Sequence, residues 1–139
     1  MNSLNIASIF SRDIQRNDDG ITDIIGIGDS FEINDDNKTD LWITVLVNGE
    51  IKQDAQLIFT IENEDRGLEL GQFSLEKVPD APKTLMDFKY VFRIQTPFPE
   101  TGEYEFRGYL IPKELIPQDG NIDPPKEYII HTSTFNIFR

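Results

Sequence analysis

Apolar side chains recur at every second residue along most of this chain, and no long stretch repeats them at the 3.6-residue interval of a helix. Residues 103–110 show this most clearly, with apolar and charged side chains on alternate positions: Tyr104, Phe106 and Leu110 against Glu103, Glu105 and Arg107. Successive side chains of a strand point to opposite faces. We therefore expect the first set in a core and the second in water.

The same alternation predicts further strands. Alternate apolar positions occur in three other segments: Ala55, Leu57, Phe59 and Ile61; Phe88, Tyr90, Phe92 and Ile94; and Ile21, Ile25, Ile27, Phe31 and Ile33. Residues 41–47 are apolar on both faces, which predicts a central strand covered on both sides. Residues 128–138 are rich in β-branched and aromatic side chains and predict a C-terminal strand.

Turn residues separate these runs. Asp18-Asp19-Gly20 and Asn48-Gly49 predict tight turns, because Asn, Asp and Gly tolerate a positive φ. Residues 63–67 predict a longer turn, 112–115 one short helical turn at most, and 118–126 a long surface loop. The sum is seven to nine strands in one all-β domain spanning residues 1–139. A mostly antiparallel β-sandwich fits best, with a small barrel as the alternative.

Composition excludes several classes of site. The chain has 139 residues, 25 acidic and 13 basic, so its formal charge of −12 disfavours binding to nucleic acid. There is no cysteine, which removes disulfides and thiolate metal sites. No apolar run is long enough to cross a membrane, and the first ten residues do not resemble a signal peptide. We expect a cytoplasmic protein that contacts no membrane.

Catalytic patterns are equally scarce. His131 is the single histidine, and no Gly-x-Ser-x-Gly motif accompanies it. Gly26-Ile27-Gly28 lacks the third glycine and the helix of a phosphate-binding loop, so we expect these glycines to permit a close approach of neighbouring chain. No pair of carboxylates stands out. The expectation is a protein that is not an enzyme and has no cofactor, catalytic residue or metal ligand.

Acidic residues concentrate in one segment. Residues 17–40 hold eight acids and one base, a net charge of −7. Three interpretations stay open: a calcium-binding loop around Asp35, Asp36 and Asp40, although the EF-hand spacing is absent; a negative surface facing a basic partner; or solvated turns that keep a small β-protein soluble. For the second, the candidate partner-facing residues are Asp18, Asp19, Asp35, Asp36 and Asp40.

Two segments resemble a known group of proteins. Residues 9–20 contain Asp13-Ile14-Gln15-Arg16 before a glycine turn, and Ile24-Ile25-Gly26-Ile27 follows. They resemble the opening of a family of small bacterial proteins of unknown function, in which a strand, a D-x-x-R turn, a glycine hairpin and a strand ending I-G-V come in order. Residues 97–106 resemble the F-P-x-x-G-x-Y-x-F entry to a late strand of that family, also found in immunoglobulin-like sandwiches. The resemblance implies an immunoglobulin-like β-sandwich.

The function expected from the sequence is a non-enzymatic protein-interaction module that binds another protein. The alternatives are an acidic inhibitor that mimics nucleic acid, a calcium-binding sandwich and a carbohydrate-binding sandwich. The last needs Trp or Tyr exposed on a sheet face, whereas the pattern around Trp42 predicts that it is buried. The oligomeric state does not follow from the sequence.

Overall fold

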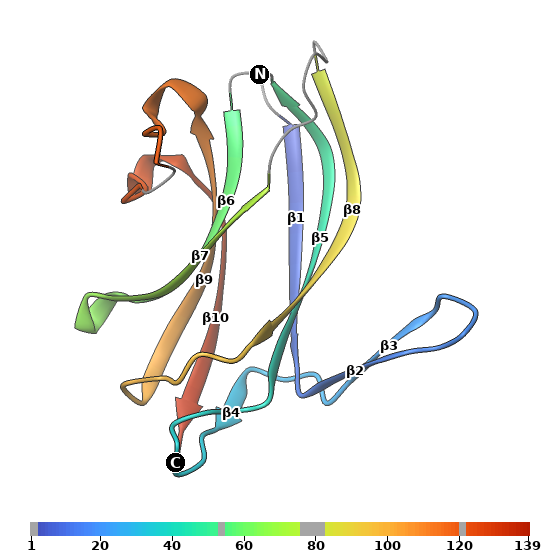
Figure 1. Cartoon of the computed structure of the whole chain (residues 1–139), viewed down its shortest axis with the longest axis vertical. Helices are drawn as coiled ribbons and strands as arrows, with labels where there is room; N and C mark the ends of the chain where they lie inside the picture. The colour runs from blue at the N-terminus through green and yellow to red at the C-terminus, as the bar shows by residue number, and fades with distance from the viewer. Residues whose placement is uncertain (1–2, 53–54, 76–82, 120–121) are drawn as a thin grey trace.

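Two β-sheets pack face to face, and a separate hairpin leaves one end of the sandwich (Figure 1). The structure, a computed structural model, describes residues 3–52, 55–75, 83–119 and 122–139. Within these ranges it describes all side chains except those of residues 3, 51–52, 73–75 and 83–88.

The smaller sheet has three antiparallel strands in the order β1 (Ser3–Ser11), β5 (Leu41–Lys52) and β8 (Lys83–Ile94). The larger has five, in the order β4 (Ser30–Glu32), β10 (Ile129–Phe138), β9 (Gly102–Pro112), β6 (Ala55–Asn63) and β7 (Leu68–Leu75). Its strands are antiparallel except β4, which runs parallel to β10. The hairpin is β2 (Asp13–Arg16) with β3 (Thr22–Ile25).

This arrangement confirms the all-β antiparallel sandwich. The described residues form ten strands rather than seven to nine, because the alternating run at 21–33 is divided between β3 and β4 and the hairpin adds β2. Three short 3₁₀ turns complete the elements: η1 (Glu64–Arg66), η2 (Lys113–Leu115) and η3 (Lys126–Tyr128). The turn expected at 112–115 is therefore present. Among the described residues, no helix is long and apolar enough to span a membrane.

The strand order is that of an immunoglobulin-like sandwich. In chain order, β1, β5 and β8 take the places of strands A, B and E, while β6, β9 and β10 take those of C, F and G. Tyr104, fully buried at the start of β9, donates its hydroxyl hydrogen to the carbonyl of Glu100 at 2.7 Å. A tyrosine in this place and with this bond is the tyrosine corner of such sandwiches. The entry to β9 thus anchors the start of this strand through the Tyr104 hydroxyl.

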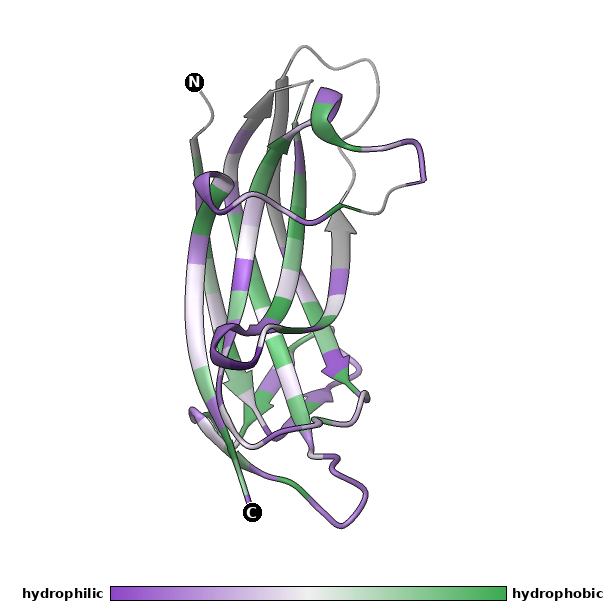
Figure 2. Ribbon diagram, turned by 90° about the vertical axis from the view of Figure 1, so that its left-hand side faces the viewer, coloured by the Kyte–Doolittle hydropathy of each residue, from purple (hydrophilic) through white to green (hydrophobic). Residues whose placement is uncertain are grey.

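Aromatic rings fill the space between the sheets. Phe59 of β6 and Phe106 of β9 stack with their centroids 5.3 Å apart, and Phe135 of β10 stacks on Tyr104 at 5.8 Å. All four alternating residues from Ala55 to Ile61 are buried, as predicted. Figure 2 shows the alternation directly, with hydrophobic and hydrophilic residues following one another along the strands. On β10, Phe135 and Ile137 face the core.

Strand β9 departs from the prediction on its outer face. Tyr104 and Phe106 are buried and Leu110 packs against the core, as expected. Arg107, however, is only 4% exposed instead of facing water. The reason is a second apolar cluster on the outside of the larger sheet, where residues of the 113–129 segment cover β6 and β9: Ile58, Tyr109 and Ile111, with Ile116, Ile122, Tyr128 and Ile129.

Strand β5 is central, as predicted, but two details differ. Its outer face is only partly covered, since Leu46 is 42% exposed and Trp42 is half-buried rather than buried. The tight turn predicted at Asn48-Gly49 is wrong. Asn48 lies within β5 and pairs with β1 on one side and β8 on the other, so these residues extend the strand.

The run from residue 21 to residue 33 is divided between two environments. Phe31 and Ile33 are buried in the sandwich core, whereas Ile21, Ile25 and Ile27 are exposed because they belong to the hairpin and its exit. In the run at 88–94, Phe92 and Ile94 pack in the core and Tyr90 is 41% exposed. The side chain of Phe88 lies outside the described residues.

Candidate functional site

The β2–β3 hairpin projects from the end of the sandwich at which β1 terminates (Figure 1). Its root is held by backbone hydrogen bonds from Arg12 N to the Ile25 carbonyl and from Gly28 N to the Phe10 carbonyl, each 3.1 Å. Gly26 lies opposite Arg12 with a φ of 70°. A Cβ there would lie 3.1 Å from the Arg12 Cβ. The close approach expected at Gly26 is therefore confirmed. At Gly28 the same expectation is wrong, because no described atom outside its chain neighbours lies within 4 Å of where a Cβ would be.

The hairpin has a covered face and a free face. Ile14 pairs with Ile24 and Arg16 with Thr22, and of these Ile14, Thr22 and Ile24 are half-buried. Thr22 Oγ1 accepts a 3.0 Å hydrogen bond from Lys89 Nζ, so this face lies toward β8. The opposite face is exposed throughout: Asp13, Gln15, Asp23 and Ile25.

Three isoleucines of this region are open to solvent. Ile21, Ile25 and Ile27 are 56%, 41% and 68% exposed, and we call them the isoleucine ridge. Acidic side chains flank them in the chain and are exposed as well: Asp18, Asp19, Asp23 and Asp29. Exposed apolar residues with a polar rim are typical of surfaces that bind a partner. The alternation at residues 21–33 predicts a strand with these isoleucines on one face, and in the structure they are exposed.

The five candidate acids are all exposed and lie in two places at this end of the sandwich. Asp18 and Asp19 form the turn of the hairpin, where Asp19 accepts a hydrogen bond from the Ile21 backbone N–H. Asp35, Asp36 and Asp40 belong to the 34–40 loop between β4 and β5. That loop is organised by Asn34, whose side-chain oxygen accepts from the N–H groups of residues 36 and 38 at 2.9 and 3.0 Å.

The described residues around the 34–40 loop do not form a set of metal ligands. Within the part of the chain that the structure describes, no three histidine or acidic side chains come together in a way that could hold a metal ion. Asp35, Asp36 and Asp40 thus share a loop without forming a cluster of ligands.

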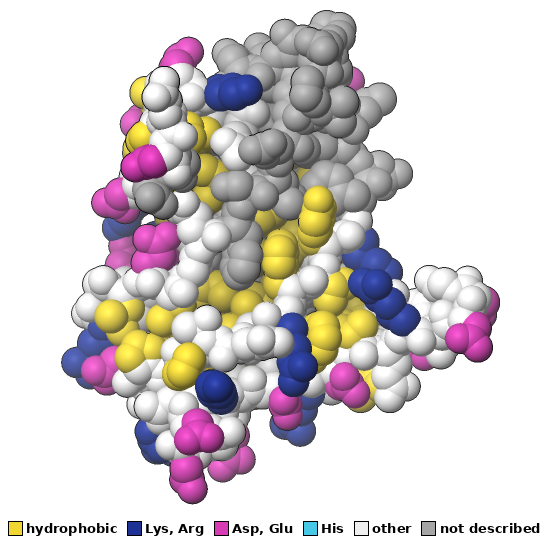
Figure 3. All heavy atoms as spheres, viewed as in Figure 1, with side chains coloured by type: hydrophobic (Ala, Val, Ile, Leu, Met, Phe, Trp, Pro, Cys, Tyr) yellow, Lys and Arg dark blue, Asp and Glu magenta, His cyan; other side chains and the backbone are white. Residues whose placement is uncertain are grey.

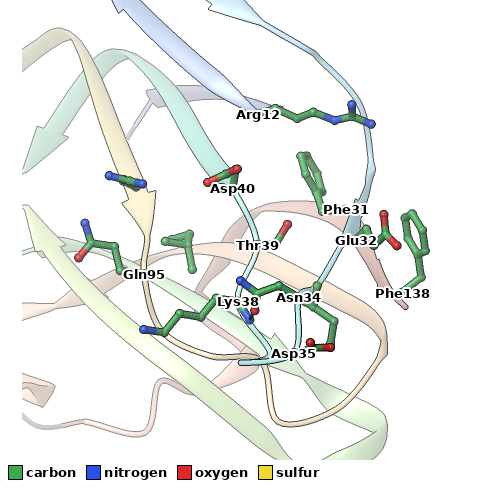
Figure 4. Close-up of a pocket in the computed structure, with 13 residues that line it drawn as sticks. Arg12, Phe31, Glu32, Asn34, Asp35, Lys38, Thr39, Asp40, Gln95 and Phe138 are labelled. Carbon is green, nitrogen blue, oxygen red and sulfur yellow. Dashed lines mark hydrogen bonds between the residues drawn. The ribbon is translucent and has the colours of Figure 1, made fainter.

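A cavity of about 890 Å³ lies at the root of the hairpin, between the 34–40 loop, β4 and the end of β8 (Figure 4). Buried apolar side chains line part of it: Phe31, Ile33 and Ile94. The charged lining is balanced, with three cations and three carboxylates: Arg12, Lys38, Arg93, Glu32, Asp35 and Asp40. Asp40 therefore borders a cavity with cationic neighbours instead of joining the hairpin acids on a uniformly negative surface.

His131 lies at the seam between the sheets. Its Nε2 is 2.9 Å from Ser8 Oγ of β1 and 3.1 Å from Ser133 Oγ, and the two hydroxyls are 2.6 Å apart. Burial lowers the pKa of His131. A catalytic triad requires a carboxylate that bonds to the imidazole. Among the described residues no carboxylate forms such a bond with His131. Ser8 is 123 positions away in the chain, so sequence spacing could not identify this cluster.

A charged cluster surrounds Arg107 on the outer face of the larger sheet. Its guanidinium pairs with Glu62 at 3.4 Å, with Glu64 at 2.9 Å and with Glu105. Burial opposes the cation, but hydrogen bonds to Tyr109 and Glu105 and the nearby carboxylates raise the pKa of Arg107 above its ordinary value. Glu64 also pairs with Lys126 of η3. The cluster thus joins the covering segment to the sheet.

No protein-family model matches the chain, and no curated protein is significantly similar to it. The fold and its surfaces are therefore the basis for assigning a function.

Proposed function

We propose that this protein is a non-enzymatic interaction module and that the β2–β3 hairpin is its partner-binding element. The observation that carries the proposal is the isoleucine ridge: three large apolar side chains exposed on a projecting hairpin and on the segment by which the chain leaves it. A projecting hairpin of this kind contributes little to the core. Its exposed apolar side chains gain most from burial against another surface.

The acids beside the ridge define the kind of surface that fits it. Residues 17–29 contain four aspartates and no base. A complementary partner surface is apolar at its centre and basic at its rim, because opposite charges speed association and reject wrong partners. Asp18, Asp19, Asp35 and Asp36 contribute to this negative end of the molecule as partner-facing residues, whereas Asp40 borders the cavity at the root of the hairpin.

The finer assignments belong to the same proposal. The strand order and the tyrosine corner support a relation to the small bacterial immunoglobulin-like sandwiches that the sequence resembles. The absence of cysteine from the sequence is compatible with a reducing cytoplasm. The position of His131, bonded to two serines at a seam, supports a structural role for the imidazole.

Affinity capture tests the proposal. The wild-type chain and a variant carrying Ile21→Ser, Ile25→Ser and Ile27→Ser are immobilised and exposed to a lysate of the native host. Ile130→Ser is the matched control, because Ile130 is 43% exposed on β10 and outside the hairpin. We expect the wild type and the control to retain the same proteins, endogenous copies of the chain included, and the hairpin variant to lose them. Identical capture by the wild type and both variants contradicts the proposal.

A further inference from the structure

We propose that the partner of the hairpin is a second copy of this chain, with the hairpin of each copy docked on the outer face of the other copy's β1–β5–β8 sheet. This inference rests on the proposed function of the hairpin and names the occupant of that surface. Two complementary surfaces of one molecule support it.

The receiving surface is the outer face of the smaller sheet. Its outward positions include exposed or half-buried apolar side chains: Ala7, Ile9, Trp42, Leu46 and Val91. A hollow of about 470 Å³ lies on this face, bordered by Ala7, Leu46 and Lys89, and we call it the sheet hollow. Leu46 is 42% exposed beside it, although it belongs to the central strand of the sheet. An exposed leucine on a central strand provides an apolar surface on which side chains of a partner can pack.

The charges of the two surfaces are opposite. Among the outward positions whose side chains the structure describes there are two cations and one carboxylate: Lys89, which also donates a hydrogen bond to Thr22 of its own hairpin, Arg93 and Glu50. In a chain with a net charge of −12, such a face is unusual. The hairpin surface at residues 17–29 carries four aspartates and no base. Figure 3 shows basic side chains over the lower part of β8 and acidic ones at the tip of the hairpin.

The placement of the two surfaces fits a twofold pair. The hairpin follows directly after β1, so its root is at the C-terminal end of that strand. The sheet hollow is bordered by Asn5 and Ala7, five or more residues earlier, which is about 17 Å along a strand. When two copies face each other with antiparallel β1 strands, the hairpin of each lies over the hollow of the other. Two identical contacts then form, as in a closed twofold dimer.

Molar mass in solution tests the inference. Light scattering over a concentration series is measured for the wild type, for Ile25→Asp with Ile27→Asp in the hairpin, and for Leu46→Asp in the sheet hollow. Ile130→Asp is the control, since it places the same charge on an exposed isoleucine of the other sheet. We expect dimers for the wild type and the control, and monomers for the other two. Unfolding midpoints verify that all variants are folded.

Mixing the variants provides the sharper test. The hairpin variant has an intact hollow and the Leu46→Asp variant has an intact hairpin, so one of the two contacts can form between them. We expect an equimolar mixture to regain association with lower affinity than the wild type. A chain carrying all three substitutions should stay monomeric in every mixture.

The outcomes separate the inference from the proposed function. A monomeric wild type, or a dimer that survives both variants, overturns the inference. If the wild type is monomeric while affinity capture still depends on the isoleucine ridge, the hairpin binds a different protein and the proposed function stands. If neither association nor capture depends on the ridge, both proposals fail.

Discussion

Arg107 is a buried cation whose partners come from three parts of the chain. Glu105 is on its own strand, Glu62 is on β6 and Glu64 begins η1. With a side chain 5% exposed, the guanidinium depends on these carboxylates rather than on water for its hydrogen bonds. Removing one partner of a buried ion pair is costly, because the remaining charges stay buried without compensation.

We predict that Arg107→Met lowers the free energy of unfolding by about 3–5 kcal/mol. The reason is that Glu62 and Glu105 would then repel each other in a partly covered site. Arg66→Met is the control, because Arg66 is exposed. It should change stability by less than about 0.5 kcal/mol. Denaturant titration measures both, and equal midpoints for the two variants would contradict the role assigned to Arg107.

Phe106 is a core residue of the sandwich. It is fully buried, stacks on Phe59 and contacts Phe10 edge to face with centroids 6.4 Å apart. Phe106→Ala should cost about 3–5 kcal/mol through lost burial and the cavity left behind. Phe138→Ala removes a phenylalanine that is 40% exposed and should cost much less. An unchanged denaturant midpoint for Phe106→Ala would show that β9 is placed incorrectly.

At the scale of strands, the sequence predicts burial well for a strand that buries one face against a single core and exposes the other to solvent. Residues 55–61 alternate because one face of β6 meets the opposite sheet, and their burial follows the pattern. The alternation predicts that Arg107 is exposed, but it is buried because a segment that comes later in the chain covers the outer face of β9. Asn48-Gly49 resembles a turn locally, yet pairing with strands on both sides extends β5 through it. Pairing with strands that are distant in the chain cannot be predicted from a short stretch of sequence.

The candidate site was predictable only in part. The acidic composition of residues 17–40 is visible in the sequence, and so are the five aspartates proposed to face a partner. The isoleucine ridge was not recognised, because a projecting hairpin and a half-buried strand share the same alternation. Only the separation of β3 from both sheets distinguishes the two.

The seam between β1 and β10 leads to a prediction of pH dependence. Burial lowers the pKa of His131 in the folded state. At a pH above the ordinary histidine pKa of about 6.5, the imidazole is neutral in the folded and the unfolded state, so its titration costs no stability. As the pH falls from there toward the lowered pKa, the unfolded chain binds the proton first, so stability is lost.

We expect the denaturant midpoint of the wild type to decline over this interval and that of His131→Gln to decline less. The difference between the two proteins isolates the histidine from the carboxylates, because both proteins contain the same carboxylates. Parallel pH profiles would show that the imidazole is equally accessible to protons in both states.

For the whole molecule, the net charge of −12 works against compactness through self-repulsion. Four Asp→Asn substitutions at residues 18, 19, 35 and 36 change it to −8. We predict an unfolding midpoint equal to or slightly above that of the wild type, since these aspartates are exposed. Added salt should stabilise the wild type more than the variant, because exposed charges are screened beyond about 8 Å at physiological ionic strength. A strongly destabilised variant would show that these acids hold the loops in place.

The start of β1 and the C-terminal residue lie at opposite ends of the sandwich (Figure 1). At the C-terminal end, Phe138 lines the cavity at the root of the hairpin and the Arg139 guanidinium donates a hydrogen bond to the Asn37 side chain. A label, linker or sensor surface attached there would therefore crowd the 34–40 loop and hinder access to the hairpin. Attachment at the end where β1 begins leaves the hairpin end of the molecule facing outward, and the orientation in which the protein is immobilised will decide which of its surfaces an experiment can sample.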